Sequence, residues 1–535
     1  MSDYKWWQRG VVYQIYPRSF NDSNGDGVGD LQGIIDKLDY LNDGTEQSLG
    51  IDAIWISPFY PSPMVDFGYD VADYTDVDSL FGDLETFDKL VEAAHAHNIK
   101  VIIDFVPNHT SDQHAWFKES RTSKDNPKRD WYIWRDPQAD GSPPNNWGSM
   151  FGGRAWTFDE TTEQYYFHQF APEQPDLNWR NPEVRVAMHD VLRFWMDRGV
   201  DGFRMDVVYV IWKHPDMPDQ PLIEGAKGRG DDDRFVQQQQ IYALNYEGIQ
   251  DIMAEIRAVL DEQGAIGIAE LWMSVAERME YYQNFELPFN FDFIGEWERY
   301  QWDAEFFRSR IDTMEEALPQ GAWGNYVLGN HDIQRMASRY GAERARVAAM
   351  LLLTLRGTPT LYNGDELGMQ NGDISPEQIV DPQGKILGVA HTRDVTRTPL
   401  QWDSSAYADF SEVEPWLPVS EDYKTRNVAT MREIPTSILT LYRRLIWYRK
   451  NHDSLAVGDY QSLPAPDDVY LYLRTHGDER HLIALNFGTD THELTMPTDA
   501  TIIMNTSLTR DGEVVAEHDK VTLYGDEGLL IRLAE

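Results

Sequence analysis

Cysteine is absent from this chain of 535 residues, which excludes disulfides and thiolate metal sites. Long apolar runs are absent too. No stretch of about 18 residues is hydrophobic enough to cross a membrane, and the first ten residues lack the apolar core of a secretion signal. Together these absences lead us to expect a cytoplasmic protein without a membrane partner.

Basic residues are scarce relative to acidic ones. The chain has 47 Lys and Arg against 89 Asp and Glu, which gives a formal net charge of −42 at pH 7. A field of this sign repels nucleic acid and anionic membranes, so neither is expected as a partner, whereas an uncharged small molecule would be indifferent to it. The acidic surplus also fits adaptation to salt, and composition does not separate the two explanations. Nothing in the sequence predicts the oligomeric state.

Regular alternation of strand and helix patterns organises most of the chain. Hydrophobic residues make up 41% of it and aromatic residues 13%, as in a globular protein, and the length suits two or three domains. Short β-prone runs alternate with amphipathic stretches of helical period, for example 84–98 and 182–199. The eight runs are 11–16, 52–57, 100–106, 202–207, 265–270, 287–291, 325–330 and 357–363. Eight such runs predict an α/β fold of the (β/α)8 barrel type, a TIM barrel.

Two regions depart from this alternation. Residues 105–178, after the third strand, are rich in Pro, Asn, Gly and Trp, which predicts a small inserted domain. In residues 456–535, apolar and polar residues alternate between turn signals, which predicts a C-terminal antiparallel β-sandwich. The barrel domain would then comprise 1–104 and 179–455.

Three acidic residues at the ends of strand-like runs form the leading candidate site. Asp206 ends GFRMD, Glu270 ends IGIAE and Asp332 closes VLGNHD. In a closed parallel barrel the carboxyl ends of all strands meet on one face, where barrel enzymes hold their active sites. Two carboxyl groups facing one bond are the minimum equipment for cleaving a glycoside. The pattern therefore predicts a catalytic cluster of acids.

Seven motifs carry or flank these acids. They are YQIYPRSF (13–20), DFVPNH (104–109), QPDLNW (174–179), GFRMDV (202–207), IAELW (268–272), GNHD (329–332) and RTPLQWD (397–403). Together they resemble the signature segments of the α-amylase family, glycoside hydrolase family 13, in the form found in oligo-1,6-glucosidases and related α-glucosidases. The resemblance implies an exo-acting, retaining α-glucosidase that acts on short α-glucosides and needs no organic cofactor.

The resemblance also assigns the catalytic roles. It implies that Asp206 is the nucleophile, that Glu270 is the proton donor and that Asp332 grips the sugar hydroxyls. Arg204 lies two residues before Asp206 and therefore shares its face of the strand. A guanidinium at this position would keep Asp206 ionised and aimed at the substrate.

Further residues match the walls of an α-glucosidase pocket. By resemblance, Asp66 and Arg397 would form a salt bridge that closes the far end of the pocket and forces cleavage from a chain terminus. The other matched substrate-binding positions are Tyr69, His109, Phe151, Phe170 and His331.

Val207, directly after the proposed nucleophile, bears on the linkage that is cleaved. In this subgroup Val here accompanies α-1,6 linkages and Thr accompanies α-1,4 linkages. Relatives with either residue can be mixed in specificity, so the preference among α-1,4, α-1,6, sucrose and trehalose stays open.

Two alternatives to hydrolysis keep the same barrel. A glucosyl-transferring relative would use the same catalytic residues, and the acceptor-side loops, roughly 210–240 and 370–396, would decide the ratio of transfer to hydrolysis. A catalytically silent barrel that acts as a partner subunit is the second alternative. Silent relatives have lost catalytic residues that this chain retains.

The segment DSNGDGVGD (22–30) has the spacing of a calcium-binding loop over its first nine positions. Its oxygen ligands would be Asp22, Asn24, Asp26, the Val28 carbonyl and Asp30. The twelfth position is Gly33 and not Glu, so the loop is not an EF-hand, but it resembles the calcium or magnesium loop of oligo-1,6-glucosidase relatives. Hard oxygen ligands favour either ion over zinc. We expect a structural Ca²⁺ or Mg²⁺, with a metal-free Asp/Gly turn as the alternative.

Overall fold

The computed structural model describes residues 4–228, 232–294 and 300–534. Its centre is a sheet of eight parallel strands in the order β8-β7-β3-β2-β1-β11-β10-β9. These strands are β1 Val12–Ile15, β2 Ala53–Ile56, β3 Lys100–Phe105, β7 Gly202–Met205, β8 Ile266–Ala269, β9 Phe289–Asn290, β10 Asn325–Val327 and β11 Thr358–Tyr362. Each predicted run contains one of them. Among the described residues no ladder joins β8 to β9, so the barrel is nearly closed, and the predicted (β/α)8 fold is confirmed.

The barrel strands are buried on both faces, as their apolar composition requires. Neighbouring strands place Trp55 beside Ile102, Ile102 beside Gly202, and Gly202 beside Ile266. The three large side chains of this row belong to the core cluster inside the barrel. Glycine is needed at position 202 because a Cβ there would lie 2.6 Å from Ile266 Cγ1. Since side chains alternate along a strand, residues two and four positions further on also face the barrel axis.

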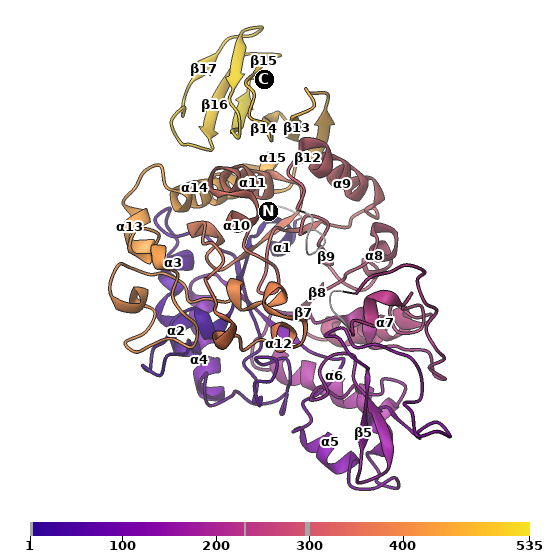
Figure 1. The fold of residues 1–535 in the computed structure, drawn as a ribbon. Helices are drawn as coiled ribbons and strands as arrows, with labels where there is room; N and C mark the ends of the chain where they lie inside the picture. The colour runs from indigo at the N-terminus through magenta and orange to yellow at the C-terminus, as the bar shows by residue number, and fades with distance from the viewer. Residues whose placement is uncertain (1–3, 229–231, 295–299, 535) are drawn as a thin grey trace.

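Helices cover the outside of the barrel (Figure 1), and longer ones such as α4, α6 and α7 bury an apolar face. In α4, residues Phe87, Leu90, Val91 and Ala94 are buried at helical spacing, and the Asp83 side chain caps the first turn by accepting from Thr86 N. The helices of the barrel region are α1 Trp6–Arg9, α2 Leu31–Asp36, α3 Leu38–Asn42, α4 Leu84–Ala96, α6 Pro182–Met196, α7 Ile249–Asp261, α8 Val275–Tyr281, α9 Ala304–Ala317, α10 Met336–Tyr340, α11 Ala342–Thr354, α12 Pro382–Leu387, α13 Val428–Arg432, α14 Ile438–Asn451 and α15 Asp453–Ala456. In the described part of the chain, none of the helices combines the length and apolar composition that a bilayer crossing requires.

The segment between β3 and α6 contains helix α5, Ala115–Ser120, and a three-stranded antiparallel sheet. Its strands are β4 Trp134–Arg135, β5 Trp156–Asp159 and β6 Gln164–Phe167, in the order β4-β6-β5. Trp147, Trp156 and Phe167 form a small core there, which also includes Met217 and Ala243 from the segment after β7. The sheet therefore packs against a loop at the carboxyl end of the barrel. The predicted boundaries at 105 and 178 stay predictions.

The C-terminal region is built from antiparallel strands and lies at the opposite end of the molecule from the β4-β6-β5 sheet (Figure 1). A six-stranded sheet has the order β12-β13-β14-β19-β16-β17, and a two-stranded sheet pairs β15 with β18. The strands are β12 Asp459–Leu463, β13 Val469–His476, β14 Glu479–Asn486, β15 His492–Thr495, β16 Ala500–Asn505, β17 Val514–Val515, β18 Lys520–Leu523 and β19 Gly528–Leu533. Residues of both sheets, among them Ile502, Val521 and Ile531, share one apolar core.

Candidate active site

Side chains alternate along each barrel strand, and this alternation determines which of them face the barrel axis at the carboxyl ends of the strands. On β7, Gly202 is followed inward by Arg204 and then by Asp206, and on β8, Ile266 is followed by Ile268 and Glu270. A cavity of about 450 Å³ opens at these strand ends. It is lined by Asp66, Tyr69, His109, Met150, Phe151, Phe170, Asp206, Val207, Tyr209, Phe235, Leu244, Glu270, Trp272, His331, Asp332, Ile333, Gln383 and Arg393. All three predicted catalytic acids therefore face one cavity.

Arg204 lies beneath this cavity and connects its acids. The guanidinium is 1% exposed, and its Nη1 donates to Asp206 Oδ1 at 2.8 Å. The same nitrogen donates to Asp104 Oδ1, and Nη2 donates to Glu270 Oε2. Because Asp206 and Glu270 bind one guanidinium, their carboxyl groups lie side by side. This arrangement suits a pair that acts on a single bond.

The carboxyl groups around Arg204 outnumber its single positive charge. One guanidinium contacts three carboxyl groups, those of Asp104, Asp206 and Glu270. Burial raises the pKa of the Asp206 carboxyl well above its ordinary value, and the positive charge of Arg204 acts against that rise. The negative charges of Glu270 and Asp104 add to that rise, and Arg204, which contacts all three carboxyl groups, partly offsets the repulsion between them.

Glu270 is held by groups on both of its oxygens. Trp272 Nε1 donates to Oε1 at 2.9 Å, and the backbone N–H of Val207 donates to Oε2 at 3.2 Å. Val207 adopts a left-handed backbone conformation with φ 36°. This conformation is strained for a β-branched residue and is found mainly where the surroundings impose it. Here it directs the Val207 N–H toward Glu270, which ties the backbone next to Asp206 to the second acid.

Asp332 is held by two arginine guanidinium groups and lies beside the His331 ring. Its Oδ1 accepts from Arg397 Nη2 at 2.9 Å and from Arg393 Nη1 at 3.3 Å, and His331 Nε2 lies 3.2 Å from Oδ2. Burial alone would raise the pKa of Asp332, but His331 and the two arginines outweigh it and hold that pKa below its ordinary value. Asp332 is therefore ionised at neutral pH.

The two predicted histidines are neutral donors or acceptors in the cavity wall. Burial lowers the pKa of His331 well below its usual range and that of His109 to about 4. His331 stacks on Tyr69 with ring centroids 5.4 Å apart and planes 3° apart. His109 Nε2 lies 3.0 Å from the Tyr69 carbonyl and 3.1 Å from Gln174 Nε2. Tyr69 thus fixes both rings at the cavity surface.

The predicted pairing of Asp66 with Arg397 is wrong. Asp66 Oδ1 accepts from Arg393 Nη2 at 2.6 Å, and Asp66 Oδ2 accepts from Gln174 at 3.1 Å. Arg397 is fully buried behind the cavity, where it contacts Asp332 and donates through Nε to the His331 carbonyl at 2.9 Å. The two arginines are one turn apart in the segment after β11. The turn Asp394–Thr396 directs Arg393 into the cavity and Arg397 beneath it.

Arg393 is the main site residue that the sequence reasoning missed. Its guanidinium also binds Asp381 Oδ1, at 2.7 Å through Nη2 and 3.0 Å through Nε, and Asp381 is fully buried. The other missed wall residues are Met150, Tyr209, Phe235, Leu244, Trp272, Ile333 and Gln383. Trp272 was within reach of sequence reasoning because it stands two residues after Glu270 in IAELW.

The apolar wall includes the two predicted phenylalanines. Phe151 and Phe170 contact each other edge to face, with centroids 5.3 Å apart, and Arg393 lies over the Phe151 ring at 5.2 Å. Phe170 also contacts the His109 ring at 5.2 Å. Aromatic faces beside polar groups suit a sugar ring, which has apolar C–H faces and polar edges.

The predicted metal loop at 22–30 is tightly organised around Asp22. Its Oδ1 accepts from the backbone N–H of Gly25 at 2.8 Å, and Oδ2 accepts from that of Gly27 at 2.8 Å and from the Ser411 hydroxyl at 2.6 Å. Gly27 has φ 89°, and a Cβ there would lie 2.5 Å from the Glu414 carbonyl oxygen. Asp30 caps α2 by accepting from Gly33 N at 2.6 Å. The loop therefore presents hard oxygen donors on a fixed backbone.

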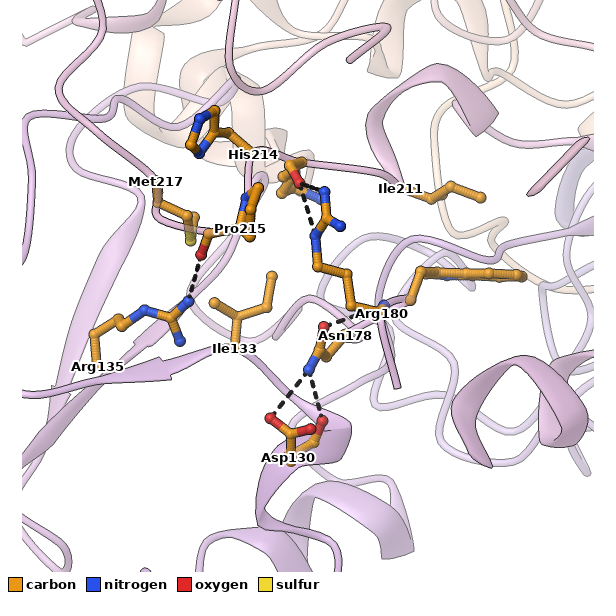
Figure 2. Close-up of a pocket in the computed structure, with 11 residues that line it drawn as sticks. Asp130, Ile133, Arg135, Asn178, Arg180, Ile211, His214, Pro215 and Met217 are labelled. Atoms are coloured by element: carbon orange, nitrogen blue, oxygen red, sulfur yellow. Dashed lines mark hydrogen bonds between the residues drawn. The ribbon is translucent and has the colours of Figure 1, made fainter. Parts of the chain in front are cut away.

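Figure 2 shows a second, smaller cavity of about 260 Å³, between the β4 region and the segment after β7. Its polar groups bind one another. Asn178 Nδ2 donates to Asp130 Oδ1 at 3.1 Å, and Arg135 Nη2 donates to the Pro215 carbonyl at 3.0 Å (Figure 2). Asp130 is the one carboxylate among its lining residues. A single carboxylate cannot supply the acid pair, so this cavity is not the catalytic one.

A (β/α)8 barrel with an acid pair at its carboxyl end defines the chain as a barrel glycoside hydrolase. The family model of the α-amylase catalytic domain matches residues 14–458 of this sequence. This chain therefore belongs to the α-amylase family.

Individual relatives match over nearly the whole chain. An oligo-1,6-glucosidase of Heyndrickxia coagulans is 42% identical, over 92% of this chain and 94% of the relative. A probable α-glucosidase of Rhizobium meliloti is 40% identical, over 92% of each chain. The crystal structure of XgtA, an α-glucosyl transfer enzyme, superposes with a TM-score of 0.91 at 37% identity and covers 99% of both chains.

Proposed function

We propose that this protein is an exo-acting, retaining α-glucosidase that releases α-glucose from the non-reducing end of short α-glucosides. The observation that carries the proposal is the acid pair on Arg204, in a cavity that the Asp66–Arg393 ion pair borders. The similarity to oligo-1,6-glucosidases and α-glucosidases supports the same activity. The partner is a small-molecule oligosaccharide or α-glucoside. A cytoplasmic location stays a prediction from sequence.

In the proposed first step, a carboxylate oxygen of Asp206 attacks the anomeric carbon while Glu270 transfers its proton to the glycosidic oxygen. The glycosidic bond breaks, the leaving sugar takes the proton, and glucose is bound covalently to Asp206. In the second step Glu270 removes a proton from water, and the water oxygen displaces Asp206 from the anomeric carbon. Arg204 holds both carboxyl groups in position throughout.

The remaining wall residues would bind the terminal glucose. Asp332 is ionised and can accept from two sugar hydroxyls, and His331 can donate to one of them. Such contacts accelerate catalysis where they strengthen as the ring flattens toward the transition state. Tyr69 and Phe170 would contact the apolar face of the ring.

Linkage preference is tested by product analysis. The purified protein is incubated separately with maltose, isomaltose, sucrose and trehalose, and the products are separated by chromatography. Glucose released from any of them supports the proposal. No release from any of the four would contradict it. Val207 accompanies α-1,6 linkages by resemblance, and the relative rates on isomaltose and maltose measure whether this association holds here.

Glucosyl transfer is the second candidate activity. The covalent intermediate permits attack by a sugar hydroxyl as well as by water, and the similarity to an α-glucosyl transfer enzyme favours this alternative. Trp272 lies at the cavity rim, is 36% exposed and packs on Phe291 with centroids 4.4 Å apart. An exposed aromatic face beside Glu270 suits an acceptor sugar. Longer products that accumulate as maltose concentration rises would indicate transfer.

The first-formed product should be α-glucose. A double displacement through Asp206 inverts the anomeric centre twice, so the configuration of the substrate is retained. Proton NMR during the first minutes of hydrolysis distinguishes the anomers before they interconvert. The appearance of β-glucose first would contradict a nucleophilic role for Asp206.

We also propose that the loop at 22–30 binds a structural Ca²⁺ or Mg²⁺. Its candidate ligands are side-chain oxygens of Asp22, Asn24, Asp26 and Asp30 with the Val28 carbonyl. All are hard oxygen donors, which fit either ion. The ion would join the loop after β1 to the segment around Ser411, which already contacts Asp22.

Chelation should lower the melting temperature of the protein, and added Ca²⁺ should restore it. A cation that binds the folded loop stabilises the fold by mass action. Differential scanning calorimetry with EDTA, then with excess Ca²⁺, measures the effect. Asp26→Ala should remove the response to Ca²⁺, whereas Asp36→Ala, an acid in α2 outside the loop, should keep it. An unchanged melting temperature in the wild type would favour the metal-free turn.

A further inference from the structure

Two histidines and one glutamate converge where the barrel meets the C-terminal sheet. His452 follows the last residue of α14, and Glu479 and His481 lie on β14. One ligand atom from each lies within 4.8 Å of the other two. His481 is fully buried, whereas the side chains of His452 and Glu479 are 22% and 29% exposed. In the described part of the chain, this is the one cluster of three His, Cys, Asp or Glu side chains close enough to share a metal ion.

Hydrogen bonds fix which nitrogen of His452 is free to bind a ligand. Its Nδ1 lies 2.8 Å from the Tyr448 carbonyl, which can only accept, so Nδ1 carries a proton. Nε2 points toward Glu479 Oε1 at 3.9 Å, which is too long for a hydrogen bond. Backbone carbonyls commonly orient metal-binding histidines through Nδ1 in this way.

The other two side chains are held in place by Ser454. The Ser454 backbone N–H donates to Glu479 Oε2 at 2.8 Å, which leaves Oε1 facing His452. The Ser454 hydroxyl lies 2.7 Å from His481 Nδ1, and the Tyr448 hydroxyl lies 2.9 Å from His481 Nε2. His452 and Glu479 thus each have an outer partner on the atom that does not face the other, and His481 has a hydroxyl group on each ring nitrogen.

His97 provides an internal comparison. It also follows a helix, α4, and its Nδ1 contacts the carbonyl four residues earlier, Ala93 O, at 2.7 Å. Its Nε2 lies 3.0 Å from Asp39 Oδ1, so a proton fills the gap and makes a normal hydrogen bond. At His452 the gap to the carboxylate is 3.9 Å, and a ring nitrogen of His481 lies within 4.8 Å of both groups.

We propose that His452 Nε2, Glu479 Oε1 and His481 Nε2 form a zinc site that joins α14 to β14. Tetrahedral zinc ligands with bonds of about 2.0–2.1 Å lie about 3.3 Å from one another, so the 3.9 Å gap between His452 Nε2 and Glu479 Oε1 would close by about half an ångström around one ion, and His481 would move toward it as well. Two imidazoles and a carboxylate favour Zn²⁺ over Ca²⁺ or Mg²⁺. The ion replaces the Tyr448 hydroxyl on His481 Nε2 and takes water in its fourth position.

The His452 side of the cluster is reachable from solvent. His452 and Tyr448 line a surface cavity of about 570 Å³ between α14 and the C-terminal sheet. A metal ion can therefore enter without unfolding of either region. Because the ligands come from the last barrel helix and from the C-terminal sheet, the ion would stabilise the contact between the two and would have no catalytic part.

The test is zinc binding by the whole protein at pH 7.5. Metal is first removed by dialysis against a chelator, Ca²⁺ is then returned in excess to fill other oxygen sites, and Zn²⁺ is titrated against a colorimetric indicator. We expect one tight equivalent of zinc and a rise in melting temperature that Ca²⁺ does not produce. Removal of one ligand should weaken binding at least about 10- to 100-fold, the loss that even an outer partner causes.

Three variants separate the site from other zinc binding. His452→Gln and Glu479→Gln should lose the tightly bound equivalent of zinc. His97→Gln should keep it, because His97 also follows a helix but, among the described residues, has no second imidazole beside it. With Co²⁺ in place of Zn²⁺, the wild type and His97→Gln should give the visible spectrum of a four-coordinate ion. His452→Gln and Glu479→Gln should not. Equal zinc binding in all four proteins, or none in the wild type, would overturn the proposal and leave the cluster as hydrogen bonds only.

Discussion

Asp206→Asn should abolish turnover of every α-glucoside while leaving the fold intact. The amide cannot form the glycosyl ester, yet it has nearly the shape of the carboxylate and can still contact Arg204. Loss of an essential nucleophile removes most of the catalysis, so the residual kcat should lie below about one hundredth of the wild-type value. Steady-state kinetics on p-nitrophenyl α-glucoside measure it, and an unchanged melting temperature shows that the fold survives.

Glu270→Gln gives the matched comparison within the acid pair. It removes the proton donor but keeps the nucleophile, so the loss should depend on the leaving group. A nitrophenolate leaves without protonation, whereas a sugar alkoxide does not. We therefore expect a much larger loss of kcat on maltose than on p-nitrophenyl α-glucoside.

Asp190→Asn, an exposed acid on α6 that contacts Arg193, is the control and should behave as wild type. Residual turnover in Asp206→Asn above about one hundredth of the wild-type rate would exclude Asp206 as the nucleophile.

Much of the barrel and its acid cluster could be predicted because one rule governs both. Alternation along a strand makes Arg204 and Asp206 share a face, and parallel strands bring their carboxyl ends to one side of the barrel. The short run at 287–291 contains a strand of two residues, and it was still recognisable because it completes the set of eight. Periodicity and motif order were sufficient for these features.

The error over Arg397 has a physical reason. Arg393 and Arg397 stand four residues apart in a long irregular segment, and no strand or helix period fixes which of them faces the cavity. Which arginine faces the cavity depends on Asp381, a buried partner that binds Arg393 and holds it next to Asp66. Such a contact joins two parts of the segment after β11 to the loop after β2, which is far away in the sequence. The same holds for Phe235 and Leu244, which reach the cavity from the long segment after β7.

The pocket should accept a terminal glucose and reject the interior of a polymer. Asp66 and Arg393 are buried and paired at 2.6 Å in the cavity wall. A glucan chain that continued past the terminal glucose would have to separate them. An uncompensated charge in a partly buried site costs about 3–5 kcal/mol. This corresponds to a factor of roughly a hundred to a few thousand against internal cleavage.

Soluble starch should therefore be a poor substrate beside maltose or isomaltose, and glucose should be the first small product. Chromatography of early time points measures both. A ladder of maltooligosaccharides, formed at a rate like that of disaccharide hydrolysis, would contradict this prediction. It would show that the Asp66–Arg393 pair does not close the pocket beyond the terminal glucose.

Asp66→Asn should lower kcat/KM on disaccharides by at least about 100-fold, because the pair that anchors the non-reducing glucose is broken and Arg393 loses a partner. A double-mutant cycle then tests which arginine belongs to Asp66. Arg393→Gln should be strongly non-additive with Asp66→Asn because the two residues are in direct contact. Arg397→Gln acts through Asp332 and the His331 carbonyl, so its effect should add more nearly to that of Asp66→Asn. A larger coupling energy of Asp66 with Arg397 than with Arg393 would instead support the Asp66–Arg397 pairing that was predicted from the sequence.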